Sequence, residues 1–388
     1  MEISSMIHCF SSPKKVHFGL NSIKKIGVEG KILGGSKAII VTDSGLMKSG
    51  LVEQIGSYLE ASGVSYFIFD QVKADPPVSV IEECVRWIRE KKVDIVIGVG
   101  GGSSLDTAKG AAIMAGNLGT ILDYAGNDLV PKPGLPKILA PTTAGTGSEV
   151  TRVLIVTDEK AGMKKAIYSD HALAEVAIVD PMLTLSMPSS VTVDTGLDAL
   201  VHAIETFVAK TATPFSDILA LKAIRLIVEN LPAAYAKGEA LEARYGMALG
   251  ALMAGFAFGS GGLGAVHALA YPLASEYHLT HGRSNAAILL HVMAFNLIGS
   301  VEKYGKIGET MGAPLEGLTP FKTAQASLTE VRNLLIQVNV STQLRNYGIP
   351  KEGISRLVQE AMKFSRLFVP NPRNLTESDV EKIYTEAW

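Results

Sequence analysis

The sequence predicts an α/β N-terminal domain with a mostly parallel sheet, followed by an all-α C-terminal domain. Apolar runs of strand length alternate with helical patterns as far as about residue 187. From about residue 189 onward the helical period dominates, and we find no convincing strand. The length of 388 residues also exceeds one ordinary core. We therefore expect one domain over residues 1–187 and a second over residues 188–388.

Each expected element of the first domain is a run whose length or apolar period fits one type of structure. Buried strands are expected at 37–43, at 66–70, in the first part of 93–115, at the start of 137–149 and at 174–180. Helices are expected at 51–62, at 78–92, where basic residues at the end favour the helix dipole, and in the second part of 93–115. Strands that alternate with helices in this way form a parallel sheet covered on both faces.

The composition excludes several classes of protein. A net charge of −2 offers no basic patch, so we expect no nucleic acid partner. Two cysteines, Cys9 and Cys84, cannot build a disulfide framework, and the first residues lack the pattern of a signal peptide. We therefore expect a cytoplasmic protein.

Residues 247–274 contain no Asp, Glu, Lys or Arg, and this length alone would admit a membrane span. Four glycines between 259 and 264 break the run, and His267 and Pro272 lie in its second half. We interpret the segment as two buried helices joined by a glycine turn, with no membrane contact. Long apolar helices of this kind also admit a homodimer.

A glycine-rich turn follows the expected strand VDIVIGV and precedes a helix. It contains Gly100, Gly101, Gly102 and Ser103. Glycines let the backbone approach an anion, and the helix start supplies free N–H groups, so the turn favours a pyrophosphate over a plain turn. It is not the GxGxxG fingerprint. A second loop, PTTAGTGSE at 141–149, is either an ordinary surface turn or part of the same cleft.

Asp43 ends the strand KAIIVTD. Its carboxylate can accept a hydrogen bond from a ribose 2′-OH and would repel a 2′-phosphate, which favours NAD over NADP. The alternative is that Asp43 caps a helix at 44–48.

Four residues form a candidate metal site. Asp198 and His202 are four residues apart in a predicted helix and share one face, while His267 lies in the uncharged segment and His281 lies in a loop before a helix. Singly, these residues fit a surface pair, a core histidine and a turn residue. Together they predict a site for one divalent metal, and their nitrogen and oxygen donors suit Fe²⁺, Zn²⁺ or another divalent ion.

Several stretches in this order resemble the iron-dependent (group III) alcohol dehydrogenases, which share the dehydroquinate synthase-like fold. They are GGGSSLDTAK (100–109), PTTAGTGSEVT (141–151), DPMLTLSMP (180–188), GLDALVHAIE (196–205), GLGAVHALAYPL (262–273), HGRSNAAILLHVMAFN (281–296) and NPR (371–373). The resemblance implies an α/β N-terminal dinucleotide-binding domain, an all-helical metal-binding domain and an active site between them. It also implies a metal-dependent oxidoreductase that transfers hydride between a primary alcohol, or its aldehyde, and NAD(H).

The resemblance also assigns residues. The family's iron ligands fall on Asp198, His202, His267 and His281. Its cofactor contacts fall on Asp43, Gly100, Gly101, Gly102, Ser103, Asp106, Thr142, Thr143, Thr146 and Lys164.

The chain departs from the family's pattern at two positions. Many relatives have a histidine four residues after the third ligand, where this chain has Tyr271, and the usual Asn before a Pro is Asp75. An unperturbed tyrosine titrates near pH 10, which makes it a poor proton relay beside an imidazole. Tyr271 and His278 are the catalytic candidates, although His278 also fits an exposed loop residue.

Other functions stay open at this stage. A tyrosine at position 271 resembles the branch of the family that handles hydroxyacids, so the alternatives are a hydroxyacid dehydrogenase or a hydroxyacid–oxoacid transhydrogenase. A lyase like dehydroquinate synthase is less well supported, because Arg283 is the only basic residue in 250–285 that could bind a polyanionic substrate. If the protein were a catalytically inactive NAD-binding module, the four candidate metal ligands would have no role, which argues against this alternative.

Overall fold

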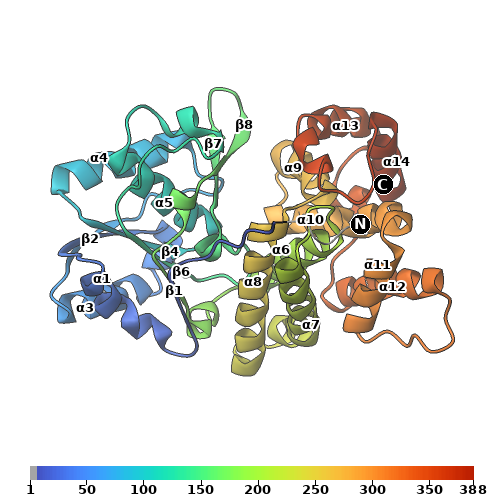
Figure 1. Cartoon of the computed structure of the whole chain (residues 1–388), viewed down its shortest axis with the longest axis horizontal. Helices are drawn as coiled ribbons and strands as arrows, with labels where there is room; N and C mark the ends of the chain where they lie inside the picture. The colour runs from blue at the N-terminus through green and yellow to red at the C-terminus, as the bar shows by residue number, and fades with distance from the viewer. Residues whose placement is uncertain (1–6) are drawn as a thin grey trace. The chain divides into compact units, whose positions relative to one another are not determined.

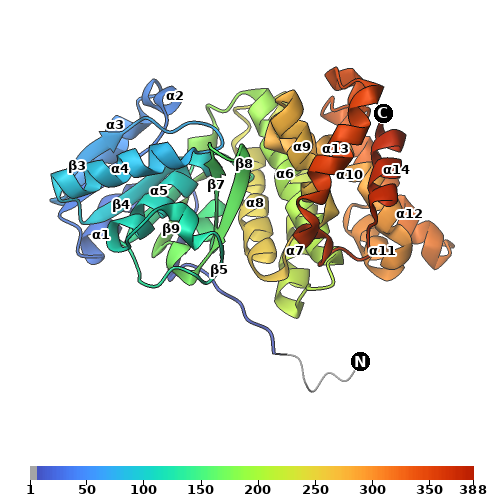
Figure 2. The same ribbon diagram turned by 90° about the horizontal axis from the view of Figure 1, so that it is seen from above.

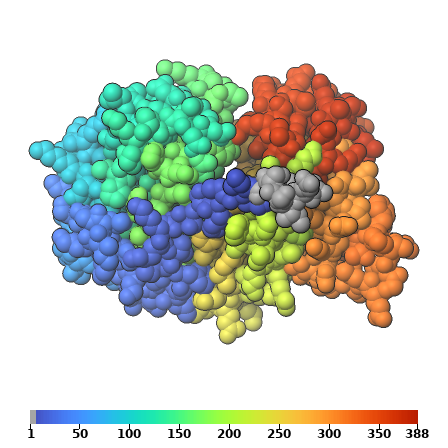
Figure 3. All heavy atoms as spheres, viewed as in Figure 1, coloured from blue at the N-terminus to red at the C-terminus, as the bar shows by residue number. Residues whose placement is uncertain are grey.

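The computed structural model describes residues 7–388 of the chain. It divides into two compact units, Ser11–Ser186 and a second made of Met187–Trp388 together with residues 7–10. The chain thus passes between the units beside the boundary expected from the sequence. The sequence did not predict that residues 7–10 belong to the second unit. It follows from Phe10, whose ring packs against Phe215 and Phe256 with centroids 5.8 and 6.0 Å apart. This start of the described chain, dark blue, is visible at the surface in Figure 3.

The first unit is built on a six-stranded sheet in the order β1-β9-β6-β4-β2-β3. All its strand pairs are parallel. The strands are β1 (Lys15–Phe18), β2 (Lys37–Val41), β3 (Ser65–Phe69), β4 (Ile95–Gly100), β6 (Lys137–Pro141) and β9 (Val176–Val179). The central strands are buried on both faces, which explains why they are continuous apolar runs instead of alternating patterns.

Helices cover both faces of this sheet, as Figure 1 shows. Alternate residues of β2 point into different cores: Ile39 and Val41 belong to one cluster, and Ala38 and Ile40 to the other. The helices α4 (Val78–Lys91) and α5 (Gly102–Gly116) pack on the first cluster, and α1 (Ile26–Ile32) and α3 (Leu51–Ala61) on the second. The predicted α/β fold class is confirmed.

A second, three-stranded sheet was not expected from the sequence. It has the order β5-β8-β7, and Figure 2 shows the three strands side by side. Its strands are β5 (Gly126–Asn127), β7 (Val153–Asp158) and β8 (Met163–Tyr168), and the pair β7–β8 is an antiparallel hairpin. The sequence MKKAIY of β8 is mostly half-buried and too polar to stand out as a strand.

The second unit is helical, and residues 187–388 contain no described strand. Its long helices are α6 (Ser189–Val208), α7 (Pro214–Ala236), α8 (Leu241–Gly261), α9 (Ala265–Tyr277), α10 (His281–Asn296), α11 (Val301–Thr310), α12 (Pro320–Gln337), α13 (Ile354–Met362) and α14 (Glu377–Ala387). The helix α6 contacts α7, α8 and α10 and is buried along most of its length, so its polar side chains Asp198, His202 and Glu205 lie inside this unit.

The uncharged segment 247–274 forms the end of α8 and the start of α9. The two helices bend by 110° at a short break, where Gly262 has a φ of +84°. Taken together they have the length and composition of a span, but across residues 7–388 no helix by itself is long and apolar enough to cross a membrane. The expected pair of helices with a glycine turn is therefore confirmed.

Candidate metal centre and phosphate loop

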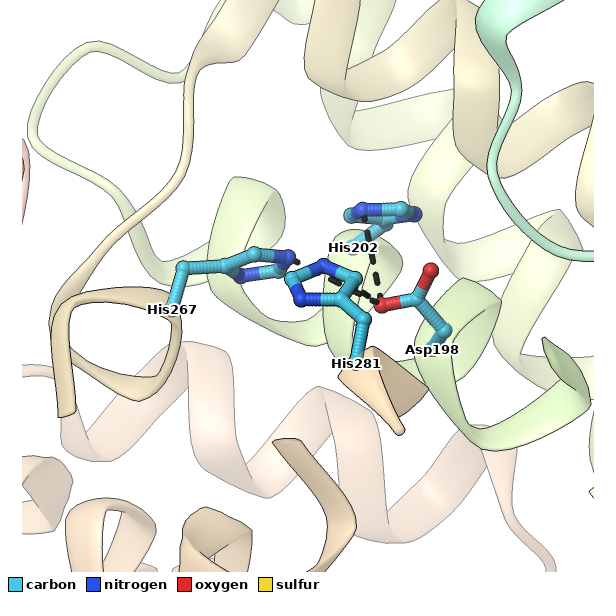
Figure 4. Close-up of side chains that lie close together, drawn as sticks. All are labelled: Asp198, His202, His267 and His281. Carbon is cyan, nitrogen blue, oxygen red and sulfur yellow. Dashed lines mark ion pairs between the residues drawn. The ribbon is translucent and has the colours of Figure 1, made fainter. Parts of the chain in front are cut away.

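The four predicted metal ligands converge in the helical unit. Each offers one ligand atom, and these atoms all lie within 4.8 Å of one another. Asp198 Oδ1 is 3.8 Å from Nε2 of His202, 3.8 Å from Nε2 of His267 and 3.5 Å from Nε2 of His281. Figure 4 shows the three rings and the carboxylate turned toward one another. These separations exceed hydrogen-bond lengths and suit groups arranged around a shared ion.

Burial and charge also fit a cation at this place. Asp198 is 3% exposed and His267 1%. Burial alone would raise the pKa of Asp198, but the neighbouring imidazoles and the Asn285 amide outweigh it and lower that pKa. The carboxylate is therefore ionised inside the protein, where a charge without a counter-charge is unfavourable. The group can hold a divalent metal.

Two helices meet tightly to place His281. It is the first residue of α10, and the Thr280 hydroxyl caps that helix by accepting a hydrogen bond from Arg283 N. The carboxylate of Asp194 in α6 accepts hydrogen bonds from Thr280 Oγ1 at 2.6 Å and from Arg283 Nε at 2.7 Å. A Cβ on Gly282 would lie 1.9 Å from the Asp194 carbonyl oxygen. Only glycine therefore allows α10 to begin so close to α6.

Asn285 and Glu205 belong to the site but were not identified from the sequence. Asn285 is fully buried one turn after His281, and its Nδ2 lies 2.7 Å from Asp198 Oδ1. Glu205 follows Asp198 by seven residues in α6, two helical turns along the same face. That spacing could have revealed Glu205, whereas Asn285 carries no sequence signal beyond its spacing of four from His281.

Aromatic rings border the ligands. Phe258 stacks on His202 with centroids 4.5 Å apart, and Tyr271 stacks on His281 at 5.8 Å. Phe364 in turn packs on Tyr271 at 4.7 Å. Of the two catalytic candidates, the structure thus brings Tyr271 next to His281, one of the four predicted ligands. His278 is exposed, ends α9 with a φ of +58° and is not part of the ligand group.

The predicted phosphate loop joins β4 to α5 in the other unit. Gly100 ends β4 with a φ of +145°, and Gly101 precedes the first residue of α5. Thr143 and Thr146 of the second loop lie against Gly101 and Gly102, and Thr142 N donates to Gly100 O at 2.9 Å. The two loops are therefore in direct contact, and their common role at one cleft stays a prediction. Free N–H groups at the start of a 15-residue helix suit an anion.

Asp43 lies beside this loop, at the carboxyl end of β2. The strand order reverses between β2 and β4, the position where open α/β sheets bind their ligands. Asp43 caps the short helix α2 (Ser44–Met47) by accepting from Gly45 N and Leu46 N, so the capping interpretation is confirmed. Both bonds use Oδ1, while Oδ2 lies 3.6 Å from where a Cβ of Gly100 would be. The ribose role stays a prediction.

Two other predicted cofactor contacts have partners within the protein. Asp106 is buried, and its oxygens accept from Ser148 Oγ at 2.6 Å and from Ile155 N at 2.9 Å. Through its hydrogen bond with Ser148, this carboxylate holds the end of the second loop against α5. Lys164 Nζ lies 2.6 Å from Asp75 Oδ1. Asp75 stands where the family usually has an asparagine. It thus gives Lys164, a predicted cofactor contact, an ionic partner that asparagine would not supply.

Two buried charged residues near Asp106 were not identified from the sequence. Lys109 is fully buried and donates to the carbonyl oxygens of Thr151 at 3.0 Å and Val153 at 2.8 Å. Burial lowers the pKa of Lys109 to about 8 and raises the pKa of Glu149 to about 7. Lys109 therefore connects α5 to Thr151, just after the second loop, and to Val153 at the start of β7.

Comparisons with known proteins agree with this geometry. Residues 13–181 match the family model described as iron-containing alcohol dehydrogenase, and residues 192–388 match the C-terminal model of the same family. The chain is 40% identical over 379 residues to long-chain-alcohol dehydrogenase 1 of Geobacillus thermodenitrificans strain NG80-2, covering 97% of this chain and 95% of that protein. It is 38% identical over 378 residues to 1,3-propanediol dehydrogenase of Citrobacter freundii, covering 97% of each.

Among solved structures, a crystal structure of 1,3-propanediol oxidoreductase has a TM-score of 0.97 and 37% sequence identity. The match covers 99% of this chain and 100% of that chain. Fold and sequence therefore point to the same family over nearly the whole length.

Proposed function

Because this chain belongs to the iron-containing alcohol dehydrogenase family, we propose that it transfers hydride between a primary alcohol, or its aldehyde, and NAD(H). The observation that carries this proposal is the convergence of one carboxylate and three imidazoles from α6, α9 and α10. The alcohol, propanediol and lactaldehyde enzymes among its relatives support the same reaction class.

Each unit has its own task in this proposal. Asp198, His202, His267 and His281 hold the metal, for which we propose Fe²⁺, with Zn²⁺ as the other candidate. The ion, when bound, supplies Lewis acidity to the reacting oxygen, and NAD accepts the hydride. The glycine loop at 100–103 holds the pyrophosphate of NAD through backbone N–H groups, and Asp43 accepts a hydrogen bond from the ribose.

Substrate turnover tests the proposal directly. The protein is loaded with Fe²⁺ under anaerobic conditions, and NADH formation is followed with primary alcohols, diols and 4-hydroxybutyrate. We expect turnover of simple alcohols and diols. Turnover confined to the hydroxyacid would replace this function with the hydroxyacid branch, and a cofactor that stays bound through gel filtration would indicate the transhydrogenase.

A ligand variant tests the site itself. His267→Ala should lose the metal and the activity together, because one of four ligands is removed. His291→Ala is the matched control: His291 lies on α10, but its Nε2 contacts Thr342 O at 3.0 Å instead of the ligand group. A metal-free His267→Ala protein that still oxidised alcohol would contradict the assignment.

A further inference from the structure

A buried carboxylate lies behind one of the metal ligands. Glu205 is 5% exposed, and its Oε2 is 2.6 Å from Nδ1 of His267. Its Oε1 accepts a hydrogen bond from Val266 N at 2.5 Å. In residues 7–388, no lysine or arginine is described as a partner of Glu205. Both carboxylate oxygens are therefore committed to the first turn of α9, next to the ligand.

We propose that Glu205 is a positioning residue of the metal centre that fixes the tautomer and orientation of His267. An ionised carboxylate only accepts hydrogen bonds, so the proton in this contact is on Nδ1 of His267. The other ring nitrogen, Nε2, faces Asp198 at 3.8 Å and keeps its lone pair for the ion. A carboxylate hydrogen-bonded to a metal-ligating histidine orients the ring and makes it a more basic ligand. This inference rests on the proposed metal site.

The charge balance of the centre supports this role. Two carboxylates, Asp198 and Glu205, are buried against three imidazoles with no other described cation beside them. A divalent ion neutralises two negative charges, so the loaded site carries no net charge when the imidazoles are neutral. Without Glu205 the same site would bury an excess positive charge, which is unfavourable in the interior.

Glu205 also caps the start of α9, where no capping side chain is present at the N-cap position. The residue before this helix is Gly264, which has no side chain to cap the first N–H groups. Glu205 accepts a hydrogen bond from Val266 N, and Asn371 Oδ1 accepts one from Ala265 N at 3.4 Å. Holding these two amides fixes the helical turn from which His267 projects.

Asn371 is itself locked in place. Its amide exchanges hydrogen bonds with Asn296 at 2.8 and 2.7 Å and donates to Arg373 O at 2.7 Å. The NPR segment and the end of α10 therefore support the first turn of α9, although neither provides a metal ligand. A small cavity lined by Glu205, Asn296, Tyr304 and Asn371 borders this network.

Glu205→Gln is the sharpest test. The variant keeps the shape and one carbonyl oxygen for Val266 N, but its NH₂ group faces Nδ1 of His267 and favours the tautomer with the proton on Nε2. We expect the affinity for Co²⁺ and Zn²⁺, measured by chelator competition, to fall about 10- to 100-fold, as for other second-sphere partners. Glu205→Ala is less informative, because water can enter the adjacent cavity and replace the carboxylate.

Three measurements separate positioning from general destabilisation. Long-range ¹H–¹⁵N NMR of labelled histidine should show His267 protonated at Nδ1 in the Zn²⁺-loaded parent and no longer so in Glu205→Gln. The visible spectrum of bound Co²⁺ should also differ between the parent and Glu205→Gln. Glu205→Asp, which keeps a carboxylate, should regain part of the metal affinity that Glu205→Gln loses. Glu276 lies on α9, the helix of His267, and is paired with Arg356 at 2.6 Å; Glu276→Gln should leave the metal affinity, the Co²⁺ spectrum and the His267 tautomer unchanged.

The outcomes distinguish this inference from the proposed function. A parent protein that binds no Co²⁺ or Zn²⁺ would overturn both. A parent that binds these ions, together with a Glu205→Gln variant of equal affinity and unchanged His267 tautomer, would overturn only the role of Glu205. Equal losses in Glu205→Gln and Glu276→Gln would likewise contradict it.

Discussion

The amide of Asn285 donates a hydrogen bond to the buried carboxylate of Asp198 across 2.7 Å. The same Nδ2 atom is 3.3 Å from Nε2 of His267 and 3.3 Å from Nε2 of His281. Asn285 therefore reaches the ligand atoms themselves, from a position one turn along α10. It provides Asp198 with a donor when no ion is present.

Asn285→Ala should destabilise the metal-free protein more than the metal-loaded protein. The substitution leaves a buried carboxylate short of one donor, and a hydrogen bond to a charged group contributes about 1.5–3 kcal/mol. A bound ion compensates for that loss. Differential scanning calorimetry with and without Zn²⁺ should show a larger metal-induced rise in Tm for the variant than for the parent. An equal rise in both would contradict the role given to Asn285.

Substitutions of Asp43 can separate its capping role from its proposed role toward NAD. Asp43→Asn keeps a good capping side chain but removes the charge, whereas Asp43→Ala removes both. We expect Asp43→Asn to keep its Tm and to shift the kcat/KM ratio toward NADP on the order of tenfold, because a repulsion of about 1–2 kcal/mol with a 2′-phosphate is lost. Asp43→Ala should also lose about 0.5–2 kcal/mol of stability. An unchanged cofactor ratio in both variants would refute the ribose contact.

Glu149 should make the stability of the first unit depend on pH. Burial raises its pKa to about 7 in the folded protein, against an ordinary value of 4.5 for a glutamate side chain. Between these values the folded state binds more protons at Glu149 than the unfolded state, so its contribution to stability declines as the pH rises from 4.5 to 7. Glu149→Gln should remove this decline. Calorimetry of the parent and of Glu149→Gln at pH 5 and pH 7.5 measures the decline in stability, and Glu60→Gln, at an exposed position, is the control. If stability fell equally with pH in Glu149→Gln and in the parent, the role given to Glu149 would be contradicted.

Tyr271 can be tested as a catalytic residue through two substitutions. Tyr271→Phe keeps the ring against His281 and Phe364 and removes only the hydroxyl, so metal affinity should be retained. Tyr271→His introduces a group that titrates near neutral pH, and we expect kcat at pH 7 to rise on the order of tenfold if proton transfer limits turnover at this position. The pH dependence of kcat checks both. Identical profiles for all three proteins would restrict Tyr271 to packing.

Sequence patterns were sufficient where burial imposes a period or where several ligand types recur together. The strands β2, β4, β6 and β9 were predicted because they are apolar runs buried on both faces, whereas the partly exposed edge strand β1 was not predicted. The four residues that converge were predicted together because Asp198 and His202 share one face of α6 and two further histidines follow. Glu205 and Asn285 were missed because their hydrogen bonds depend on the packing of α6, α9 and α10. For Glu205, the spacing of seven residues from Asp198 within α6 was a signal that could have been used. The strand β8 was missed because a half-buried strand with two lysines has no clear apolar alternation.

The α/β unit Ser11–Ser186 is preceded and followed in the sequence by residues of the helical unit, since residues 7–10 belong with Met187–Trp388. Along the chain, Ser11–Ser186 is joined covalently to Met187–Trp388 only at Ser186–Met187, whereas residues 7–10 belong with the helical unit through non-covalent packing such as that of Phe10 on Phe215 and Phe256. A single cut between Ser186 and Met187 would therefore divide the chain into two polypeptides, and the fragment that carries Ser11–Ser186 would keep the packing of Phe10 on Phe215 and Phe256. Expression of Ser11–Ser186 alone would require two cuts in the chain, one of which removes the anchoring ring of Phe10.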